Sequence, residues 1–78
     1  MATPKIRLWW AHLETRNYEF DAFGLTEAEA LAELKAGWRR HRLQSGATMT
    51  WSELVEGGDV NAMEIETHTC YIDRHRVE

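Results

Sequence analysis

The side chains of this 78-residue chain best suited to chemistry are its histidines, its single cysteine and its carboxylates. His68 and Cys70 are two residues apart, which would place an imidazole and a thiol on one face of an extended segment. His12 would join them if its strand pairs with theirs, and these three ligand types suit zinc. Because the chain has no second cysteine and no histidines four residues apart, we expect a free thiol beside a surface histidine, and no bound metal.

The sequence gives less support to a catalytic role for these side chains than to a metal site. A cysteine–histidine pair also needs an orienting group and an oxyanion site, and the sequence indicates neither. Four carboxylates on predicted strands are explained by a solvated face: Glu14, Asp21, Glu64 and Glu66. We predict that the protein is not an enzyme and uses no cofactor. A small metal-binding or hydrolytic protein using His68 and Cys70 is the second alternative.

Basic side chains gather toward the end of a predicted helix, at Lys35, Arg39, Arg40 and Arg42. Such a flank is either a solvated helix edge or a contact for nucleic-acid phosphates. The formal net charge of −4 argues against a dedicated nucleic-acid binder, which usually carries a basic excess. A nucleic-acid-associated regulator is therefore the first alternative function, and we expect no DNA or RNA binding.

The residues from Leu25 to Gly46 predict one long amphipathic helix. Thr26 and Glu29 fit a capping box, with Glu29 bonding back to the amide of Thr26. Gly46 suits the left-handed residue that ends a helix. Gly37 predicts a close approach to a sheet. The apolar stripe expected to face the core consists of Leu31, Leu34 and Trp38.

Two strands precede this helix, at residues 5–14 and 18–23, and their short connection predicts a hairpin. The first strand is apolar on both faces, which is typical of a central strand. A right-handed crossover through the helix places a third strand beside the first, giving the order two-one-three. We predict a single α+β domain over residues 1–78. Along the chain the elements follow the order β-β-α-β. The sheet has three or four strands, antiparallel or mixed, and one long helix packs on one of its faces.

The last third of the chain is less regular. Residues 50–53 form a second capping box, which opens a short helix. Residues 63–72 are either one long strand or a hairpin that turns at 67–69. Residues 73–78 are expected to be a charged tail.

One face of this sheet lacks an obvious cover. If the helix covers the face with Leu8 and Trp10, Trp9 is left on the opposite face with Phe23. Alternatively, residues 51–55 fold over that face and bury it. An exposed aromatic patch marks a partner surface, so the predicted partner-binding residues are Trp9, Phe23 and Trp51. The partner is either a second copy, giving a homodimer, or a different protein.

A resemblance supports the protein-binding interpretation. Residues 18–34, YEFDAFGLTEAEALAEL, resemble the strand–helix unit of HicB-like antitoxin domains, although no DNA-binding element of that family follows. In size, charge and architecture the chain is also similar to small phage-encoded inhibitors such as anti-CRISPR proteins. Both resemblances imply a non-enzymatic inhibitor or antitoxin that binds a protein target.

Composition sets the remaining expectations. One cysteine cannot form an internal disulfide, so a reducing cytoplasm is the expected location. No stretch has the roughly 20 apolar residues of a membrane span, and the N-terminus lacks the apolar run of a signal peptide. A chain this short also buries only about 60% of its unfolded surface, which leaves its own core marginal.

Overall fold

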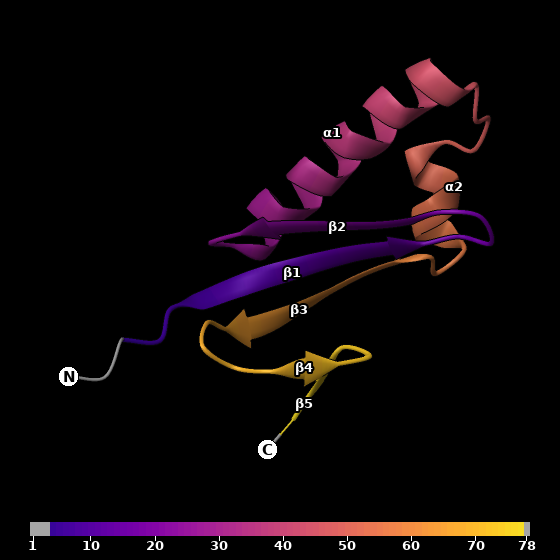
Figure 1. Cartoon of the computed structure of the whole chain (residues 1–78). Coiled ribbons are helices and arrows are strands. Elements are labelled where there is room, and N and C mark those ends of the chain that lie inside the picture. The colour runs from indigo at the N-terminus through magenta and orange to yellow at the C-terminus, as the bar shows by residue number, and fades with distance from the viewer. Residues whose placement is uncertain (1–3, 78) are drawn as a thin grey trace.

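The structure is a computed structural model that describes residues 4–77 and shows an α+β fold (Figure 1). The elements of this part of the chain are β1 (Arg7–Glu14), β2 (Glu19–Gly24), α1 (Glu27–Ser45), α2 (Trp51–Glu56), β3 (Val60–Glu66), β4 (Tyr71–Ile72) and β5 (His75–Arg76). An antiparallel sheet has the order β2-β1-β3, with α1 packed on it. The predicted fold class and strand order are confirmed. No helix within residues 4–77 has the length and apolar character needed to cross a membrane.

The core forms between α1 and one face of the central strand β1. Ala11 lies opposite Ala22 on β2 and Ala62 on β3, so a row of small side chains crosses the sheet on this face. Ala11 and Leu13 are fully buried. The buried cluster consists of Ala11, Leu13, Ala30, Leu34, Trp38 and Leu54. Small side chains let the helix approach the sheet closely, which is why this face of β1 lies under α1.

This arrangement corrects the expected position of Trp9. Trp9 shares its face of β1 with Ala11 and Leu13 and packs against the buried cluster. Leu8 and Trp10 point to the opposite face, which α1 does not cover. Phe23 lies opposite Trp10 in the register and therefore shares that face. The helix covers the face with Trp9, and the premise that placed Trp9 on the uncovered face is wrong.

The predicted helix caps are present with one change. Thr26 Oγ1 accepts a hydrogen bond from the Glu29 amide at 3.1 Å. The Glu29 carboxylate accepts from the Leu25 amide at 3.1 Å, one residue before the predicted donor. Gly46 has the expected left-handed φ of 75° and ends α1.

Gly37 and Gly24 differ in whether a larger side chain would fit at their positions. A Cβ at Gly37 would meet no atom within 4 Å, so the predicted close approach at Gly37 is wrong. At Gly24 a Cβ would lie 2.6 Å from the Ala30 amide nitrogen and 2.8 Å from the Glu29 Cβ. The close approach between sheet and helix is therefore at Gly24, where β2 passes beneath the first turn of α1.

The C-terminal segment also differs from the expectation. β3 ends at Glu66, and β4 and β5 form a separate hairpin through the pairs Tyr71–Arg76 and Ile72–His75. Part of the predicted charged tail is thus a strand. Asp73 and Arg74 have φ values of 48° and 64°, the positive pair of a type I′ turn. This hairpin and α1 lie on opposite sides of the sheet (Figure 1).

Trp38 provides the first prediction, because its ring is 2% exposed and its Nε1 donates to the Met49 carbonyl at 3.0 Å. Trp38→Ala should lower the free energy of unfolding by about 3–5 kcal/mol, measured by urea denaturation. Leu43→Ala is the control, since Leu43 is on the same helix and 88% exposed. Equal effects of the two substitutions would contradict this account of the core.

The two glycines provide the second prediction. Gly37→Ala should raise the free energy of unfolding by roughly 0.5–1 kcal/mol, because alanine favours the helix and its methyl group meets open space. Gly24→Ala should lower it, because the methyl group collides with the backbone of α1. Urea denaturation of both variants tests the pair, and a destabilised Gly37→Ala would show that the outer side of α1 is packed.

Candidate functional site

A groove lies between α1, α2 and β3, on the side of the sheet that carries α1. It arises because α1 packs mainly over β2 and β1 and leaves the flank of β3 open. Its volume is about 490 Å³. The lining is mostly apolar: Glu27, Ala28, Leu31, Ala32, Lys35, Trp51, Val55, Val60, Asn61 and Ala62. We call it the α1–α2–β3 groove.

The walls of this groove follow from helical and strand spacing. Ala28 and Ala32 are one turn apart on α1, and Trp51 and Val55 are one turn apart on α2. The side chains of Ala28 and Ala32 are small and project little from α1, which leaves space beside this helix. Val55 is 49% exposed, so an apolar side chain of the groove remains in contact with solvent.

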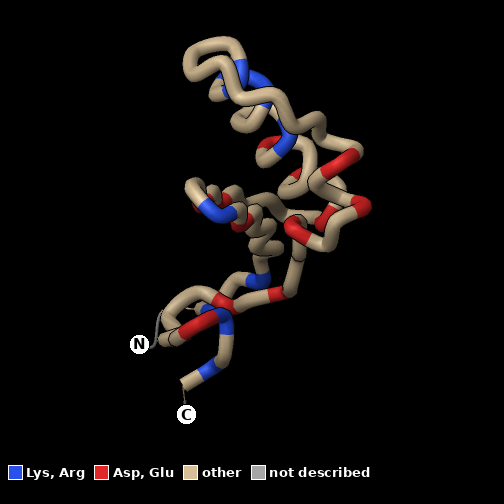
Figure 2. The backbone as a smooth tube through the Cα atoms, turned by 90° about the vertical axis from the view of Figure 1, so that its right-hand side faces the viewer, with Lys and Arg blue, Asp and Glu red and all other residues tan. Residues whose placement is uncertain are grey.

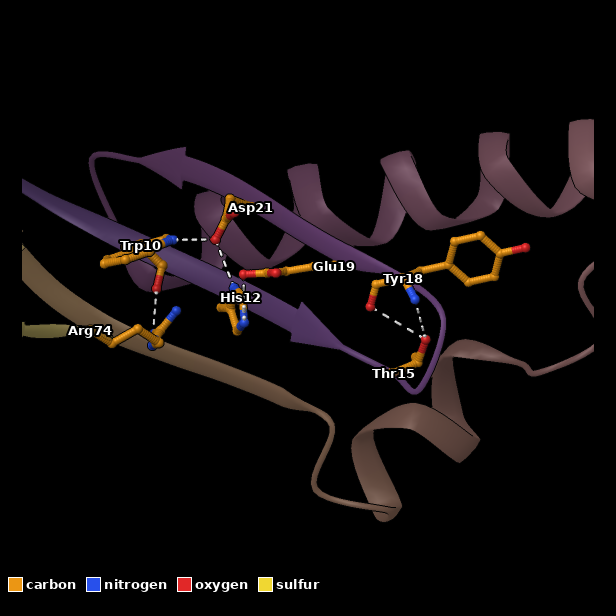
Figure 3. Close-up of polar contacts among 7 residues, drawn as sticks. All are labelled: Trp10, His12, Thr15, Tyr18, Glu19, Asp21 and Arg74. Carbon is orange, nitrogen blue, oxygen red and sulfur yellow. Dashed lines mark hydrogen bonds and ion pairs between the residues drawn. The ribbon is translucent and has the colours of Figure 1, made fainter. Parts of the chain in front are cut away.

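The other face of the sheet carries a polar network centred on Asp21 (Figure 3). Asp21 Oδ1 accepts a hydrogen bond from Trp10 Nε1 at 2.6 Å and lies 2.7 Å from His12 Nδ1. The guanidinium of Arg74 lies 4.5 Å from the centre of the Trp10 ring and donates to the Trp10 carbonyl at 3.2 Å. Phe23 stacks on Trp10 with ring centres 6.2 Å apart and is 53% exposed.

These contacts change the acidity of Asp21. Burial alone would raise the pKa of the Asp21 carboxyl, but the hydrogen bonds from His12 and Trp10 outweigh it and lower the pKa below its usual value. The charge of Arg74 acts in the same direction, as does that of His12 whenever its ring is protonated. Asp21 is therefore a carboxylate at neutral pH, and we assign the proton of the His12 ring to Nδ1, which donates to it.

The structure separates the three predicted partner-binding residues. Phe23 lies on the face away from α1, whereas Trp9 packs against the core under α1. Trp51 lines the α1–α2–β3 groove. Leu54 of α2 belongs to the buried cluster under α1, so α2 does not fold over the other face. The alternative that residues 51–55 bury the second face is wrong for the face with Phe23, part of which the β4–β5 hairpin covers. It holds for Trp9, because Trp9, Trp51 and Leu54 belong to one packed cluster.

The predicted basic residues lie together only in part. Lys35, Arg39 and Arg42 line one small hollow between α1 and the start of α2, and Arg40 is not in its lining. The Arg42 side chain donates to the carbonyls of Ala47 and Thr48 at 3.3 and 3.5 Å, so part of its hydrogen-bonding capacity secures the connection to α2. Lys and Arg positions gather toward the end of α1 and toward the β4–β5 hairpin (Figure 2).

The residues predicted for the metal alternative do not assemble. His68 and Cys70 are exposed, in the connection between β3 and β4. His12 is instead buried on β1 and paired with Asp21. In the part of the chain that the structure describes, the group of side chains able to hold a metal ion is His12, Glu14 and Glu19.

Sequence reasoning missed the groove and the pairing of His12 with Asp21. The groove depends on how far one helix extends across three strands, which no local pattern reports. The pairing was accessible: the short turn after Glu14 fixes the hairpin register, and that register places His12 opposite Asp21.

Trp10→Phe provides the third prediction, since it removes the indole N–H donated to Asp21 and keeps an aromatic ring. The pKa of the Asp21 carboxyl should rise in this variant, as measured by NMR titration, and Trp51→Phe should leave it unchanged. A carboxyl whose pKa is lowered by folding contributes stability that is complete above its unfolded-state pKa and is lost as the pH falls through its folded-state pKa. The acid side of the stability curve should therefore flatten in Trp10→Phe.

Comparison of the chain with protein-family models, curated proteins and solved structures found no match.

Proposed function

We propose that this protein is a non-enzymatic binding module that receives an amphipathic helix of another protein in the α1–α2–β3 groove. The observation that carries the proposal is the groove itself, an apolar hollow of about 490 Å³ with a half-exposed Val55 in its wall. An amphipathic helix laid into an apolar groove is a recurring mode of protein recognition.

The dimensions of the groove favour a helix as the occupant. Its α1 wall extends from Glu27 to Lys35, roughly 12 Å at 1.5 Å per residue, or about two helical turns. A helix in this position would occupy the place of a second helix on the sheet, beside α1 and above β3. It would bury the apolar side chains of Leu31, Trp51 and Val55.

The charges at the groove specify the partner further. Glu27 and Lys35 both belong to its lining, about two turns apart on α1. A complementary helix carries an apolar stripe, with a cation near Glu27 and an anion near Lys35. Opposite charges at a rim contribute to orientation and association rate more than to affinity.

A second copy of this chain is a poorer occupant. The apolar stripe of α1 is already buried against the sheet, through Ala30, Leu34 and Trp38. α2 has six residues and its Leu54 is fully buried. Residues 4–77 of each copy therefore contain no free amphipathic helix, which favours a different protein over a homodimer.

An inhibitor or an antitoxin would use such a groove by covering a helix that its target needs. The resemblance of residues 18–34 to HicB-like antitoxin domains agrees with this role. The nucleic-acid alternative is less well supported, because Arg42 is engaged with the 47–48 backbone.

Val55→Glu and Ala32→Glu test this proposal from the two walls of the groove. Both side chains are exposed, so the variants should fold, as circular dichroism would show. A displayed library of amphipathic helical peptides, selected on the wild-type protein, should yield binders whose affinity falls at least tenfold in both variants. Leu43→Glu is the matched control, because it adds the same charge at an exposed apolar position of α1 outside the groove.

Peptides that bind the two groove variants as well as wild type would overturn the proposal. Light scattering over a dilution series tests the other occupant. A wild-type dimer that either groove variant converts to a folded monomer would replace the foreign helix with a second copy.

A further inference from the structure

At the turn end of the β1–β2 hairpin, on the face opposite the groove, three potential ligands meet. They are the imidazole of His12 and the carboxylates of Glu14 and Glu19, whose ligand atoms lie within 4.8 Å of one another. His12 and Glu14 are two residues apart on β1, and Glu19 is the first residue of β2. We propose that these three residues form a binding site for a divalent transition-metal cation, with Zn²⁺ as the best fit.

His12 provides the first reason. The His12 residue is 7% exposed, but its Nε2 reaches the surface, where it makes no hydrogen bond within residues 4–77 and faces Glu19 Oε1 at 3.8 Å. The other ring nitrogen, Nδ1, is 2.7 Å from Asp21 Oδ1. Histidines that bind metals usually donate their second N–H to a carboxylate in this way, which fixes the tautomer and aims the free nitrogen at the ion. Figure 3 shows dashed contacts from the His12 ring to both Asp21 and Glu19.

The second reason is an unfavourable pair of charges. Glu14 and Glu19 are directly opposite each other in the hairpin register. Like charges at opposite positions of neighbouring strands destabilise a sheet. A cation bound between the two carboxylates would attract both of them and offset their mutual repulsion.

The turn between the two strands fixes this arrangement. Thr15 Oγ1 accepts from the Tyr18 amide at 3.0 Å, and the Thr15 amide donates to the Tyr18 carbonyl at 2.8 Å. These bonds close the turn and set Glu14 opposite Glu19. The three ligands therefore come from two adjacent strands joined by a short, bonded connection.

The distances suit zinc after a small contraction. Ligand atoms bound about 2.1 Å from a tetrahedral zinc lie roughly 3.4 Å apart. The separation between His12 Nε2 and Glu19 Oε1 is 3.8 Å, and both glutamates are exposed, so their side chains can rotate inward. One imidazole with two carboxylates suits zinc better than calcium or magnesium, which prefer all-oxygen sets. Three protein ligands leave a fourth position on a tetrahedral zinc ion, and a water molecule would occupy it.

Glu14→Gln is the decisive variant, because Glu14 is exposed and outside the core. Calorimetric titration of chelator-treated wild type with Zn²⁺ should show one ion per chain. Glu14→Gln should reduce the affinity at least tenfold, and Asp21→Asn should reduce it about 10–100-fold by releasing His12. Glu33→Gln, the same charge change on the exposed side of α1, should bind like wild type.

Thermal unfolding distinguishes a metal ligand from a merely structural residue. Without metal, Glu14→Gln should melt no lower than wild type, because the substitution relieves the repulsion from Glu19. Added Zn²⁺ should raise the melting temperature of wild type more than that of Glu14→Gln at the same zinc concentration, since the stability gained by the folded state grows with its affinity for the ion.

Three results would overturn the site: no stoichiometric zinc in wild type, unchanged affinity in Glu14→Gln, or zinc binding that is lost in Cys70→Ser and retained in Glu14→Gln. The last would move the metal to the His68–Cys70 segment. The groove proposal is independent of all three, because Val55 and Ala32 lie on the other side of the sheet.

Discussion

The central strand β1 is apolar on both faces, and the rest of the structure meets the requirement that both faces be covered. On one face, Ala11 and Leu13 are fully buried beneath α1. On the other face, Trp10 has no helix above it and contacts Phe23, Tyr71 and Arg74 instead. The described part of the chain has one long helix, which packs on the first face, so the second cover is assembled from a hairpin and from side chains of β2.

The second cover depends on polar bonds as much as on apolar contact. The indole N–H of a tryptophan that packs under other side chains usually has a partner. The half-buried Trp10 has one in Asp21, which also contacts His12. Arg74 adopts a φ of 64°, a left-handed conformation that is uncommon for residues other than glycine. Its contact with the ring and carbonyl of Trp10 offsets that strain. The β4–β5 turn is thus stabilised in part by the strand that it covers.

That dependence explains which parts of the fold were predictable. The caps of α1 and α2 rest on Thr26, Gly46 and Thr50, all visible in the sequence, and they are present. The β4–β5 hairpin has Asp-Arg in place of Asn-Gly at its turn, so no local signal announced it. The face of β1 that receives α1 was ambiguous because both faces are apolar. The acidic side of β2, with Glu19 and Asp21, marks the solvent face once the register is known.

The two candidate sites also differ in how far the sequence alone could predict them. The groove exists because α1 is too narrow to cover β3 as well as β1 and β2, so its position follows from packing geometry. Of its lining residues, only Trp51 was predicted from the sequence to bind a protein partner. The histidine–carboxylate cluster follows from register alone: a short turn after Glu14 places two glutamates opposite each other and His12 opposite Asp21. The two sites therefore lie on opposite faces of one small sheet and have no lining or ligand residue in common. A substitution on one face can accordingly test its own site while leaving the side chains of the other site in place.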